Sequence, residues 1–394
     1  MSGTATSWAT AAAIVAAALA TVLVGAYGGR LSRTTSDFLV ASRTVGPRWN
    51  AAAISGEYLS AASFLGVAGL VAKYGADALW YPVGFTAGYL GLLLFVSAPL
   101  RRSGAYTVPD FAEFRLESAR ARTVAMLVVV VICVLYLVPQ YQGAGLTLKI
   151  LLGVPVWVGP LVVGAVVIAN VVGGGMRSIT FVQAFQYWLK LTAIAVPALA
   201  LTVLFAGDRP SLGGPRPPTI GHDTTVAIET DVLVQVLRPD GIAVDGAPLP
   251  SAGNYQVHRG NTMTLAAGSS TPVVAGAPAA GDDWLTSGAG LGGKHPLFQV
   301  LSLIVATFLG TMGLPHVLVR FYTNPDGRAA RRTALAVVAL LSVFYIFPTL
   351  LGIFAEAVGA GLDTVLLLGR LQDAQKAMVY ALARMAEFRD ADTG

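Results

Sequence analysis

The sequence predicts an all-α polytopic membrane protein that carries one small β-rich extracytoplasmic insert. Hydrophobic residues make up 55% of its 394 residues, charged residues make up only 12%, and the mean hydropathy is +0.67. In soluble domains about a quarter of the residues are charged. Apolar runs long enough to cross roughly 30 Å of hydrocarbon recur along the chain. One long polar segment, residues 207–295, interrupts them.

We expect about eight membrane spans from the lengths of these runs. The runs cover residues 6–27, 48–72, 78–100, 123–148, 154–173, 181–206, 297–320 and 333–358. The first run occupies the position of a signal peptide, but no lysine or arginine precedes it, and Arg30 and Arg33 follow it. That charge order is typical of a membrane anchor whose N-terminus lies outside the cytoplasm.

Arginine is concentrated in alternate connections between the spans. The loops after the first, third, fifth and seventh spans hold Arg30, Arg33, Arg43, Arg48, Arg101, Arg102, Arg115, Arg120, Arg122, Arg177, Arg328, Arg331 and Arg332. Lysine and arginine are enriched in cytoplasmic loops. We therefore expect a multi-pass protein of the cytoplasmic (cell) membrane, with its N-terminus and the polar insert outside. The net charge of +5 is mostly an orientation signal, and no basic–aromatic pattern indicates nucleic-acid binding.

The polar insert at 207–295 contains five cationic and eight anionic residues, a formal charge of −3. It predicts a few β-hairpins, because short β-branched runs alternate with turn sequences. The runs lie at 225–228 and 232–236, the turns at 239–241, 245–246 and 259–260, and Pro/Gly-rich linkers at 209–218 and 268–281. Two interpretations fit such a module: a sensor or docking surface, or a solvated insertion without a separate activity.

Two apolar segments are interrupted near their midpoints, by Gly56–Ser60 in the first and by Gly310–His316 in the second. In hydrocarbon, unpaired backbone groups are tolerated only where they face protein, ions or a wet cavity. A pair of such breaks, one in each half of a chain, points to the binding site of a secondary transporter. The carbonyl groups freed at one half-helix suit a cation such as Na⁺, and the N–H groups at the next suit an anionic substrate.

The residues around these breaks resemble the sodium:solute symporter family. The resemblance is carried by five motifs, at residues 37–46, 56–66, 104–111, 174–176 and 309–323. The run Ser60–Gly66, the last motif and Thr180–Gln183 are similar to the cation:acetate (monocarboxylate) symporter branch. The resemblance covers roughly residues 36–358 apart from the insert.

The resemblance implies two inverted five-helix repeats preceded by an extra helix, with the opening helix of each repeat unwound. On that basis residues 1–206 form the extra helix and the first repeat, and residues 296–358 form the first two helices of the second repeat. Residues 207–295 are the insert, and residues 359–394 form an extracytoplasmic tail in which 371–388 read as an amphipathic interfacial helix.

The second repeat is therefore expected to be incomplete, as though the chain were truncated at its C-terminus. In the family the sodium site combines carbonyl groups of the first broken helix, which match Gly56 and Leu59, with hydroxyl groups on the third helix of the second repeat. No counterpart of that helix is recognisable after residue 358. We expect the chain alone to be a defective or partial symporter.

The candidate site follows from the two breaks. Gly56 and Leu59 are the predicted cation (metal) ligands. The predicted substrate-binding residues are Glu57, Tyr58, Ser60, Ser63, Gln140, Gly310, Thr311, Gly313 and Pro315. Glu57 has a structural alternative as the partner of a nearby donor, and the hydroxyl residues have one as packing or back-bonding groups. Gln140 is a candidate because it lies beside an expected break at Pro139.

Three further charged residues are interpreted from their positions alone. Lys190 lies within the sixth apolar run and either pairs with Glu57 or reaches toward an interface. Arg320 and Arg328 lie at the end of the seventh run and beyond it, and are interpreted as cytoplasmic anchors.

We predict symport of a small monocarboxylate such as acetate with a coupling cation, Na⁺ in the first place. Acetate, propionate and pyruvate, and both Na⁺ and H⁺, fit these residues, and no cofactor other than the coupling ion is implied. The alternative is a non-transporting membrane protein whose insert acts as a sensor or docking module. An enzyme is not predicted, because the sequence has no phosphate-binding loop, histidine/cysteine cluster or nucleophile elbow.

Overall fold

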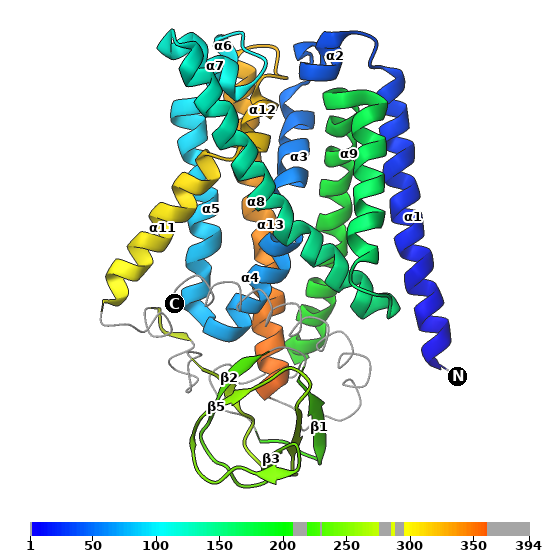
Figure 1. The fold of residues 1–394 in the computed structure, drawn as a ribbon, viewed down its shortest axis with the longest axis vertical. Helices are drawn as coiled ribbons and strands as arrows, with labels where there is room; N and C mark the ends of the chain where they lie inside the picture. The colour runs from blue at the N-terminus through cyan, green and yellow to red at the C-terminus, as the bar shows by residue number, and fades with distance from the viewer. Residues whose placement is uncertain (1, 208–218, 229–230, 276–284, 288–294, 361–394) are drawn as a thin grey trace. The chain divides into compact units, whose positions relative to one another are not determined.

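Within the described residues, helices form nearly all of the structure outside the polar insert (Figure 1). The structure, a computed structural model, describes residues 2–207, 219–228, 231–275, 285–287 and 295–360. It contains two compact units. The first comprises Met1–Phe64, Pro82–Val196 and Ile304–Ile346, and the second comprises the described parts of Leu65–Tyr81, Pro197–Leu303 and Phe347–Gly394.

The helices follow one another closely along the chain. In order they are α1 (Ser2–Arg30), α2 (Thr35–Val40), η1 (Ala41–Arg43), α3 (Pro47–Tyr58), α4 (Ala61–Tyr74), η2 (Gly75–Leu79), α5 (Trp80–Gly91), η3 (Leu92–Val96), α6 (Ser97–Arg102), α7 (Val108–Leu116), α8 (Ala119–Leu152), α9 (Val158–Gly207), α11 (Pro296–Met312), α12 (Pro315–Phe321) and α13 (Gly327–Ala360).

Both predicted breaks are present in the structure. Helix α3 ends at Tyr58, Leu59 adopts a non-helical conformation with ψ of 80°, and α4 begins at Ala61. Helix α11 ends at Met312, and α12 begins at Pro315 with a bend of 49° between them. Proline suits the first turn of a helix because its missing N–H is not needed there. The two interruptions are therefore confirmed.

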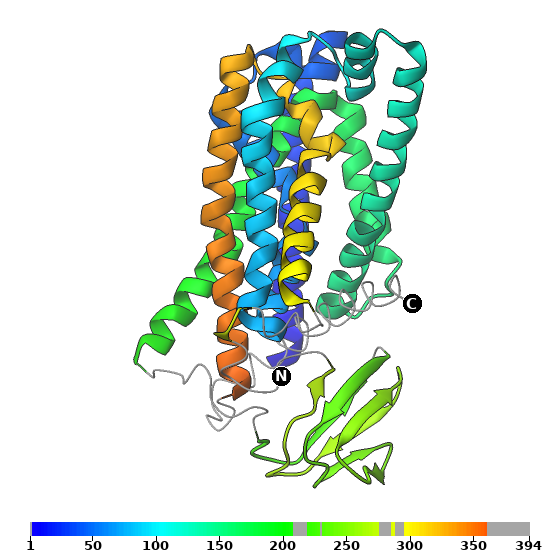
Figure 2. The same cartoon turned by 90° about the vertical axis from the view of Figure 1, so that its left-hand side faces the viewer.

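Small residues let α5 pack closely against α11. Side-chain carbon atoms added at Gly84 or Gly88 would meet Thr307 or Thr311 of α11, and Figure 2 shows the two helices side by side. Close approach at small residues is the usual way in which helices associate inside a membrane. This contact places the second break within the first unit.

One long helix turns where the sequence predicts a loop between two spans, and another continues through an expected break. Helix α9 reverses at Gly175, whose φ of 55° and ψ of −143° are not helical, and residues on both sides of the turn, Asn170 and Ser178, lie against Gly25 of α1 (Figure 1). Helix α8 runs without interruption from Ala119 to Leu152 with Pro139 inside it. The expected break at Pro139 is therefore wrong: neighbouring groups can accommodate an interior proline in a membrane helix.

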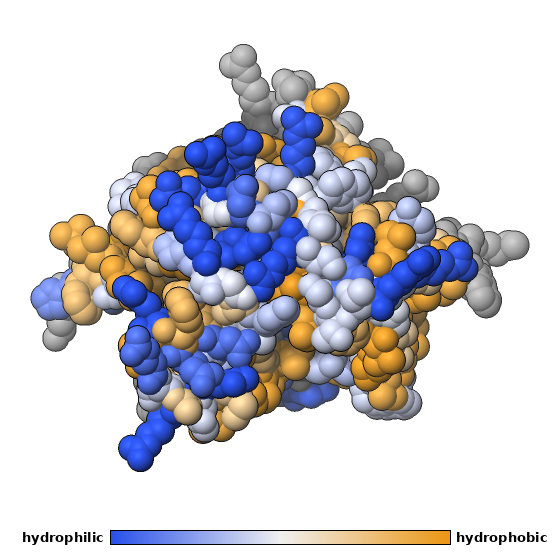
Figure 3. All heavy atoms as spheres, turned by 90° about the horizontal axis from the view of Figure 1, so that it is seen from above, coloured by the Kyte–Doolittle hydropathy of each residue, from blue (hydrophilic) through white to orange (hydrophobic). Residues whose placement is uncertain are grey.

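The arginine-rich loops after the first, third, fifth and seventh predicted spans meet at one end of the first unit. Arg43 donates to Gly104 and Ala105, Arg101 donates to Asn324 and Pro325, and Asp37 pairs with Arg177. Helices α2 and α7 both begin here with a capping box, made by Thr34 with Asp37 and by Thr107 with Asp110. Figure 3 shows hydrophilic side chains gathered over this face. We call this face the arginine-rich end.

The number of spans is not confirmed as eight. Within the described residues, five helices are long and apolar enough to cross a membrane, or six if the α11–α12 pair counts as one span. The difference arises partly because Gly66–Arg102 and Val158–Val203 are each counted as one helix, although each includes parts of two predicted runs and the second reverses at Gly175. The arrangement as inverted repeats stays a prediction.

The insert folds as two small antiparallel sheets in the second unit. The strands are β1 (Thr224–Ala227), β2 (Val232–Val236), β3 (Ile242–Val244), β4 (Ala247–Pro248), β5 (Gly253–Val257), β6 (Thr262–Leu265) and β7 (Val273–Val274). Their orders are β1-β6-β3-β4 and β5-β2-β7. The hydrophobic core is formed by Val234, Val236, Ile242, Val257, Met263 and Leu265.

One predicted hairpin turn is present in this module, whereas the turns at 239–241 and 259–260 connect strands of different sheets. Asp245 and Gly246 both have positive φ, 49° and 80°, and join β3 to β4, as a two-residue hairpin turn requires. The small β-rich region is thus confirmed, whereas its sensor or docking role stays a prediction. The linker at 209–218, residues 276–281 of the second linker and the predicted tail helix at 371–388 lie outside the described residues.

Candidate functional site

The first break is held close to the second half of α9 by Gly56. A side-chain carbon at this position would meet the Gln183 carbonyl oxygen and the Tyr187 backbone nitrogen of α9. Only glycine allows two helix backbones to approach this closely. The last turn of α3 therefore lies directly on α9.

The amino group of Lys190, on α9, lies at the backbone carbonyls where the sequence predicts a metal cation. Its Nζ donates to the carbonyl oxygens of Gly56 and Leu59, at 2.7 and 2.9 Å. The sequence left open whether Lys190 pairs with Glu57 or reaches an interface, and the structure places its ammonium on these two carbonyls. The predicted role of Gly56 and Leu59 as cation ligands is not tested by this contact, but the oxygens do hold a positive group.

Glu57 is paired with Arg320 of α12. The Nε of Arg320 lies 2.6 Å from Oε2 of Glu57, and the two side chains are 1% and 19% exposed. Arg320 Nη1 also donates to Thr180 Oγ1 at 3.0 Å and contacts the Met176 sulfur at 3.3 Å. A buried guanidinium needs such partners, because an unpaired charge away from water is costly.

The interpretation of Arg320 as a cytoplasmic anchor is therefore wrong. Its backbone does lie near the arginine-rich end, where the Arg320 carbonyl accepts from Asn50 Nδ2 at 2.9 Å. Side chains on a helix point back toward the N-terminus of that helix, so the guanidinium reaches inward along α12 to Glu57. Arg328, in contrast, is exposed.

The two breaks meet through Tyr58 and Thr311. The Tyr58 hydroxyl lies within interaction range of Thr311 and Tyr345, and Thr311 is 3% exposed. The Tyr58 ring makes edge contacts with Phe85 and Tyr89 at centroid distances of 6.1 and 5.2 Å. The structure thus brings a residue from each predicted break into one aromatic-walled region.

The other candidates are distributed unevenly around this region. Ser60 lies near the hydroxyl of Tyr136 on α8, while Ser63 Oγ donates to the Ser60 carbonyl at 2.8 Å, the local back-bonding alternative. Gln140, about one helical turn beyond Tyr136, is half-buried. In the second break Pro315 is buried, and Gly310 and Gly313 are exposed. The site assignments of these residues remain predictions.

Sequence reasoning missed Arg320 and Thr180 and did not find the partner of Lys190. A signal was available for the two cations, because a charge inside or beside an apolar run marks a functional site by default. Their partners could not be identified, since both come from helices distant in sequence: 134 residues separate Lys190 from Gly56 and 263 separate Arg320 from Glu57.

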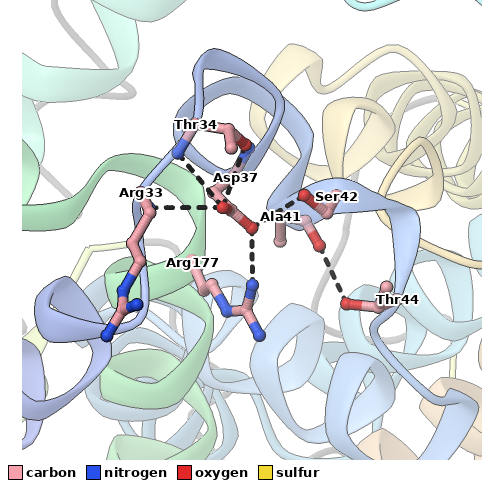
Figure 4. A network of polar contacts seen from close by, with 7 residues as sticks. All are labelled: Arg33, Thr34, Asp37, Ala41, Ser42, Thr44 and Arg177. Carbon is pink, nitrogen blue, oxygen red and sulfur yellow. Dashed lines mark hydrogen bonds and ion pairs between the residues drawn. The ribbon is translucent and has the colours of Figure 1, made fainter.

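A second polar network lies at the arginine-rich end and is centred on Asp37 (Figure 4). Asp37 accepts from Ser42 Oγ at 2.7 Å and from Thr34 Oγ1 at 2.9 Å, and it pairs with Arg177 at 2.5 Å. The hydrogen bond from Ser42, followed by those from Thr34, Arg33 and Arg177, lowers the pKa of Asp37 well below its usual range, against the opposing effect of burial. The network ties α2 to the turn of α9 beside Gly175.

Comparison with known proteins places these features in context. The model of the sodium:solute symporter family matches residues 38–209 and 262–382. A Bacillus subtilis protein described as the uncharacterized symporter YwcA is 31% identical over 345 residues, covering 88% of this chain and 55% of the relative. A Corynebacterium glutamicum protein named monocarboxylic acid transporter is 30% identical over 344 residues, covering 86% and 53%. The chain thus spans about half the length of these relatives.

Proposed function

The chain belongs to the sodium:solute symporter family, and from this premise we propose that it serves the symport of a small monocarboxylate such as acetate with a coupling cation. The family and the relatives are transporters and not enzymes. The monocarboxylate rests on the motifs at Ser60–Gly66 and Leu309–Thr323 and on the name of the Corynebacterium glutamicum relative. Either Na⁺ or H⁺ serves as the cation in this proposal.

The observation that carries the proposal is the meeting of two interrupted helices within one unit. The α3–α4 and α11–α12 breaks approach each other at Tyr58 and Thr311. Backbone interruption at membrane depth is tolerated where it lines a binding cavity, and paired breaks of this kind form the substrate and ion sites of secondary transporters. Charged residues inside membrane segments mark the same pathways, which supports a role for Glu57, Lys190 and Arg320.

We assign the coupling cation to the carbonyls of Gly56 and Leu59 and the substrate to the region of Tyr58, Ser60 and Thr311. The carboxylate of the substrate would be held by backbone N–H groups at the start of α4, where the helix dipole favours negative charge. The remaining predicted substrate residues, Glu57, Ser63, Gln140, Gly310, Gly313 and Pro315, are retained as candidates at the edges of this region.

The proposed orientation puts the arginine-rich end in the cytoplasm of the cell, with the N-terminus and the β module outside. The alternating distribution of arginine supports it, as does the meeting of the four arginine-bearing loops at one face. The same proposal includes the two inverted repeats, each opened by a broken helix.

Uptake of radiolabelled acetate into proteoliposomes that contain the purified 394-residue chain tests the function. Because the chain alone is expected to be a partial symporter, uptake should be slow, yet saturable and above that of protein-free liposomes, with propionate and pyruvate as competitors. The protein-free control matters because undissociated acetic acid crosses lipid by itself. Absence of saturable uptake of all three acids would refute the transport proposal, and solute binding by the full chain without transport would favour the sensor role of the insert.

A further inference from the structure

Three buried polar atoms close to the meeting point of the two breaks have no hydrogen-bond partner among the residues that the structure describes. They are the hydroxyl oxygens of Tyr89 on α5 and Tyr345 on α13, and Nε2 of His316 on α12. Tyr89 and Tyr345 are 0% and 5% exposed. Burying a polar group without a partner destabilises a fold, and such atoms are few in native proteins. Three of them in one region indicate a site whose hydrogen-bond partner is a ligand.

Shared neighbours bring these three side chains together. Tyr89 and Tyr345 interact electrostatically with each other and with Tyr58 and Tyr136. The ring centroids of Tyr58 and Tyr89 are 5.2 Å apart, and those of Tyr136 and His316 are 4.7 Å apart. The Tyr345 hydroxyl lies within range of the Tyr58 hydroxyl without completing a hydrogen bond. The five residues therefore form one group, which we call the tyrosine–histidine cluster.

The tyrosine–histidine cluster touches both broken helices. Tyr58 is the last residue of α3, and His316 is the second residue of α12. The hydroxyl of Tyr136 lies near Ser60, the residue that precedes α4. A carboxylate held by the backbone N–H groups at the start of α4 would therefore lie beside the cluster.

The chemistry of the unpartnered atoms matches a carboxylate. A phenolic hydroxyl and one nitrogen of a neutral imidazole can each donate a hydrogen bond, and an ionised carboxylate only accepts. Hydrogen bonds to an ionised acceptor are stronger than those between neutral groups. Glu57 interacts electrostatically with Tyr89 and His316, but its charge is compensated by Arg320 at 2.6 Å. The donors therefore do not face an uncompensated negative charge that would repel an anionic ligand.

Aromatic rings form an apolar wall next to these donors. The ring centroid of Phe85 lies 6.1 Å from that of Tyr58 and 6.4 Å from that of Tyr345, on which Phe85 is stacked with an interplanar angle of 26°. Apolar and aromatic walls with a few placed polar groups are typical of small-molecule sites. The wall suits a short alkyl chain, and the donors suit one carboxylate.

We propose that the hydroxyl groups of Tyr89 and Tyr345 and Nε2 of His316 bind the carboxylate of the transported acid as neutral hydrogen-bond donors. This inference rests on the proposed symport function. The carboxylate accepts from these donors beside the start of α4, and the alkyl chain packs against Tyr58 and Phe85. A dicarboxylate such as succinate is excluded, because its second charge would lie unpaired against the aromatic wall.

Removing single hydroxyl groups separates a ligand site from a structural one without requiring transport. Tyr89→Phe and Tyr345→Phe delete unpartnered hydroxyls, whereas the control Tyr322→Phe deletes one that donates to the Thr107 carbonyl at 3.1 Å, at the arginine-rich end. Thermal unfolding of the full chain in detergent is measured first without substrate. We expect no loss of stability in the two cluster variants and a lower unfolding temperature in the control. A loss of stability in both cluster variants would show that their hydroxyls hold the fold together and would overturn the proposal.

The same samples are then measured with propionate, against equal concentrations of chloride and of succinate. Propionate should raise the unfolding temperature of the wild type and of Tyr322→Phe, since a ligand that binds only the folded state stabilises it. The rise should be much smaller in Tyr89→Phe and Tyr345→Phe, and succinate should have no effect on the wild type. An undiminished propionate effect in both cluster variants would contradict the assignment.

Transport separates this inference from the function on which it rests. In proteoliposomes the KM for acetate should rise roughly tenfold in Tyr89→Phe, Tyr345→Phe and His316→Leu, and His316→Gln, which keeps an N–H donor, should recover part of the loss. Saturable wild-type uptake with an unchanged KM in all three variants would refute the carboxylate site alone. No saturable uptake by the wild type would refute the symport function, and the propionate effect on unfolding would still decide whether the cluster binds a carboxylate. Absence of both uptake and the propionate effect would refute both.

Discussion

Arg320 Nε lies 2.6 Å from Glu57 Oε2, although 263 residues separate the two in the sequence. The pair joins the first broken helix to the segment that follows the second break, and Arg320 is 1% exposed. Removing one member of a buried pair leaves the other as an uncompensated charge. The two breaks are thus coupled electrostatically as well as by packing.

We expect Arg320→Leu to destabilise the protein by about 3 to 5 kcal/mol, the range for breaking a buried ion pair from one side. Thermal unfolding of the detergent-purified chain measures the loss. Arg328→Leu is the matched control, because Arg328 is exposed. The double variant Glu57→Gln, Arg320→Leu should lose less than the sum of the single changes. Equal effects at positions 320 and 328 would mean that the pair does not stabilise the fold.

Gly56→Ala should weaken the contact between α3 and α9, since the added carbon meets the Gln183 carbonyl oxygen and the Tyr187 backbone nitrogen. Overpacking of this kind costs about 1 to 3 kcal/mol. The unfolding temperature should fall, and uptake should fall with it because Lys190 is displaced from the carbonyls. Gly173→Ala is the control, as nothing lies within 4 Å of a carbon added there. An unchanged unfolding temperature in Gly56→Ala would contradict the close approach of α3 and α9.

The Asp37 network predicts a defined dependence of stability on pH. The pKa of Asp37 is lowered in the folded protein, first by the Ser42 hydrogen bond, so its stabilising contribution is complete above the unfolded pKa of about 3.9 and is lost as the pH falls below that value. The difference in unfolding temperature between wild type and Asp37→Asn should be constant from pH 7 to about pH 5. It should shrink below about pH 4. A difference that changes between pH 5 and 7 would contradict the assignment.

Thr311→Val tests whether the Tyr58–Thr311 region contacts the substrate. The change keeps the volume and removes the hydroxyl of Thr311, a residue that is 3% exposed. Loss of a hydrogen bond worth about 1 kcal/mol should raise the KM for acetate roughly fivefold with a smaller effect on the maximal rate. Thr202→Val is the control, because Thr202 bonds the preceding turn of α9. Unchanged kinetics in Thr311→Val would exclude substrate contact at this hydroxyl.

Orientation can be measured by cysteine labelling. In a Cys133→Ser background, single cysteines are introduced at Asp240, in an exposed turn of the β module, and at Arg328, exposed at the arginine-rich end. In intact cells a membrane-impermeant maleimide should label position 240 and should reach position 328 only after permeabilisation. The reverse pattern would invert the proposed topology.

The sequence was informative where the cause of structure is local. Gly56–Ser60 and Gly310–His316 marked the two breaks, because glycine and proline weaken a helix at the position where they occur. Asp245–Gly246 marked a hairpin turn for the same reason. Pro139 misled the prediction, since the cost of an interior proline depends on neighbouring groups and α8 continues through it.

The sequence by itself determined the membrane environment, the positions of the breaks, the β module and the family, all of which follow from composition and from residues close together in the chain. Only the tertiary structure decided that Lys190 meets the carbonyls of Gly56 and Leu59 and that Arg320 turns inward to Glu57. The physical reason is that a buried cation can choose among several polar groups. The partner of each cation is determined by which helix faces pack together. Here Gly56 brings α3 against α9, and the Arg320 side chain points back along α12 toward Glu57.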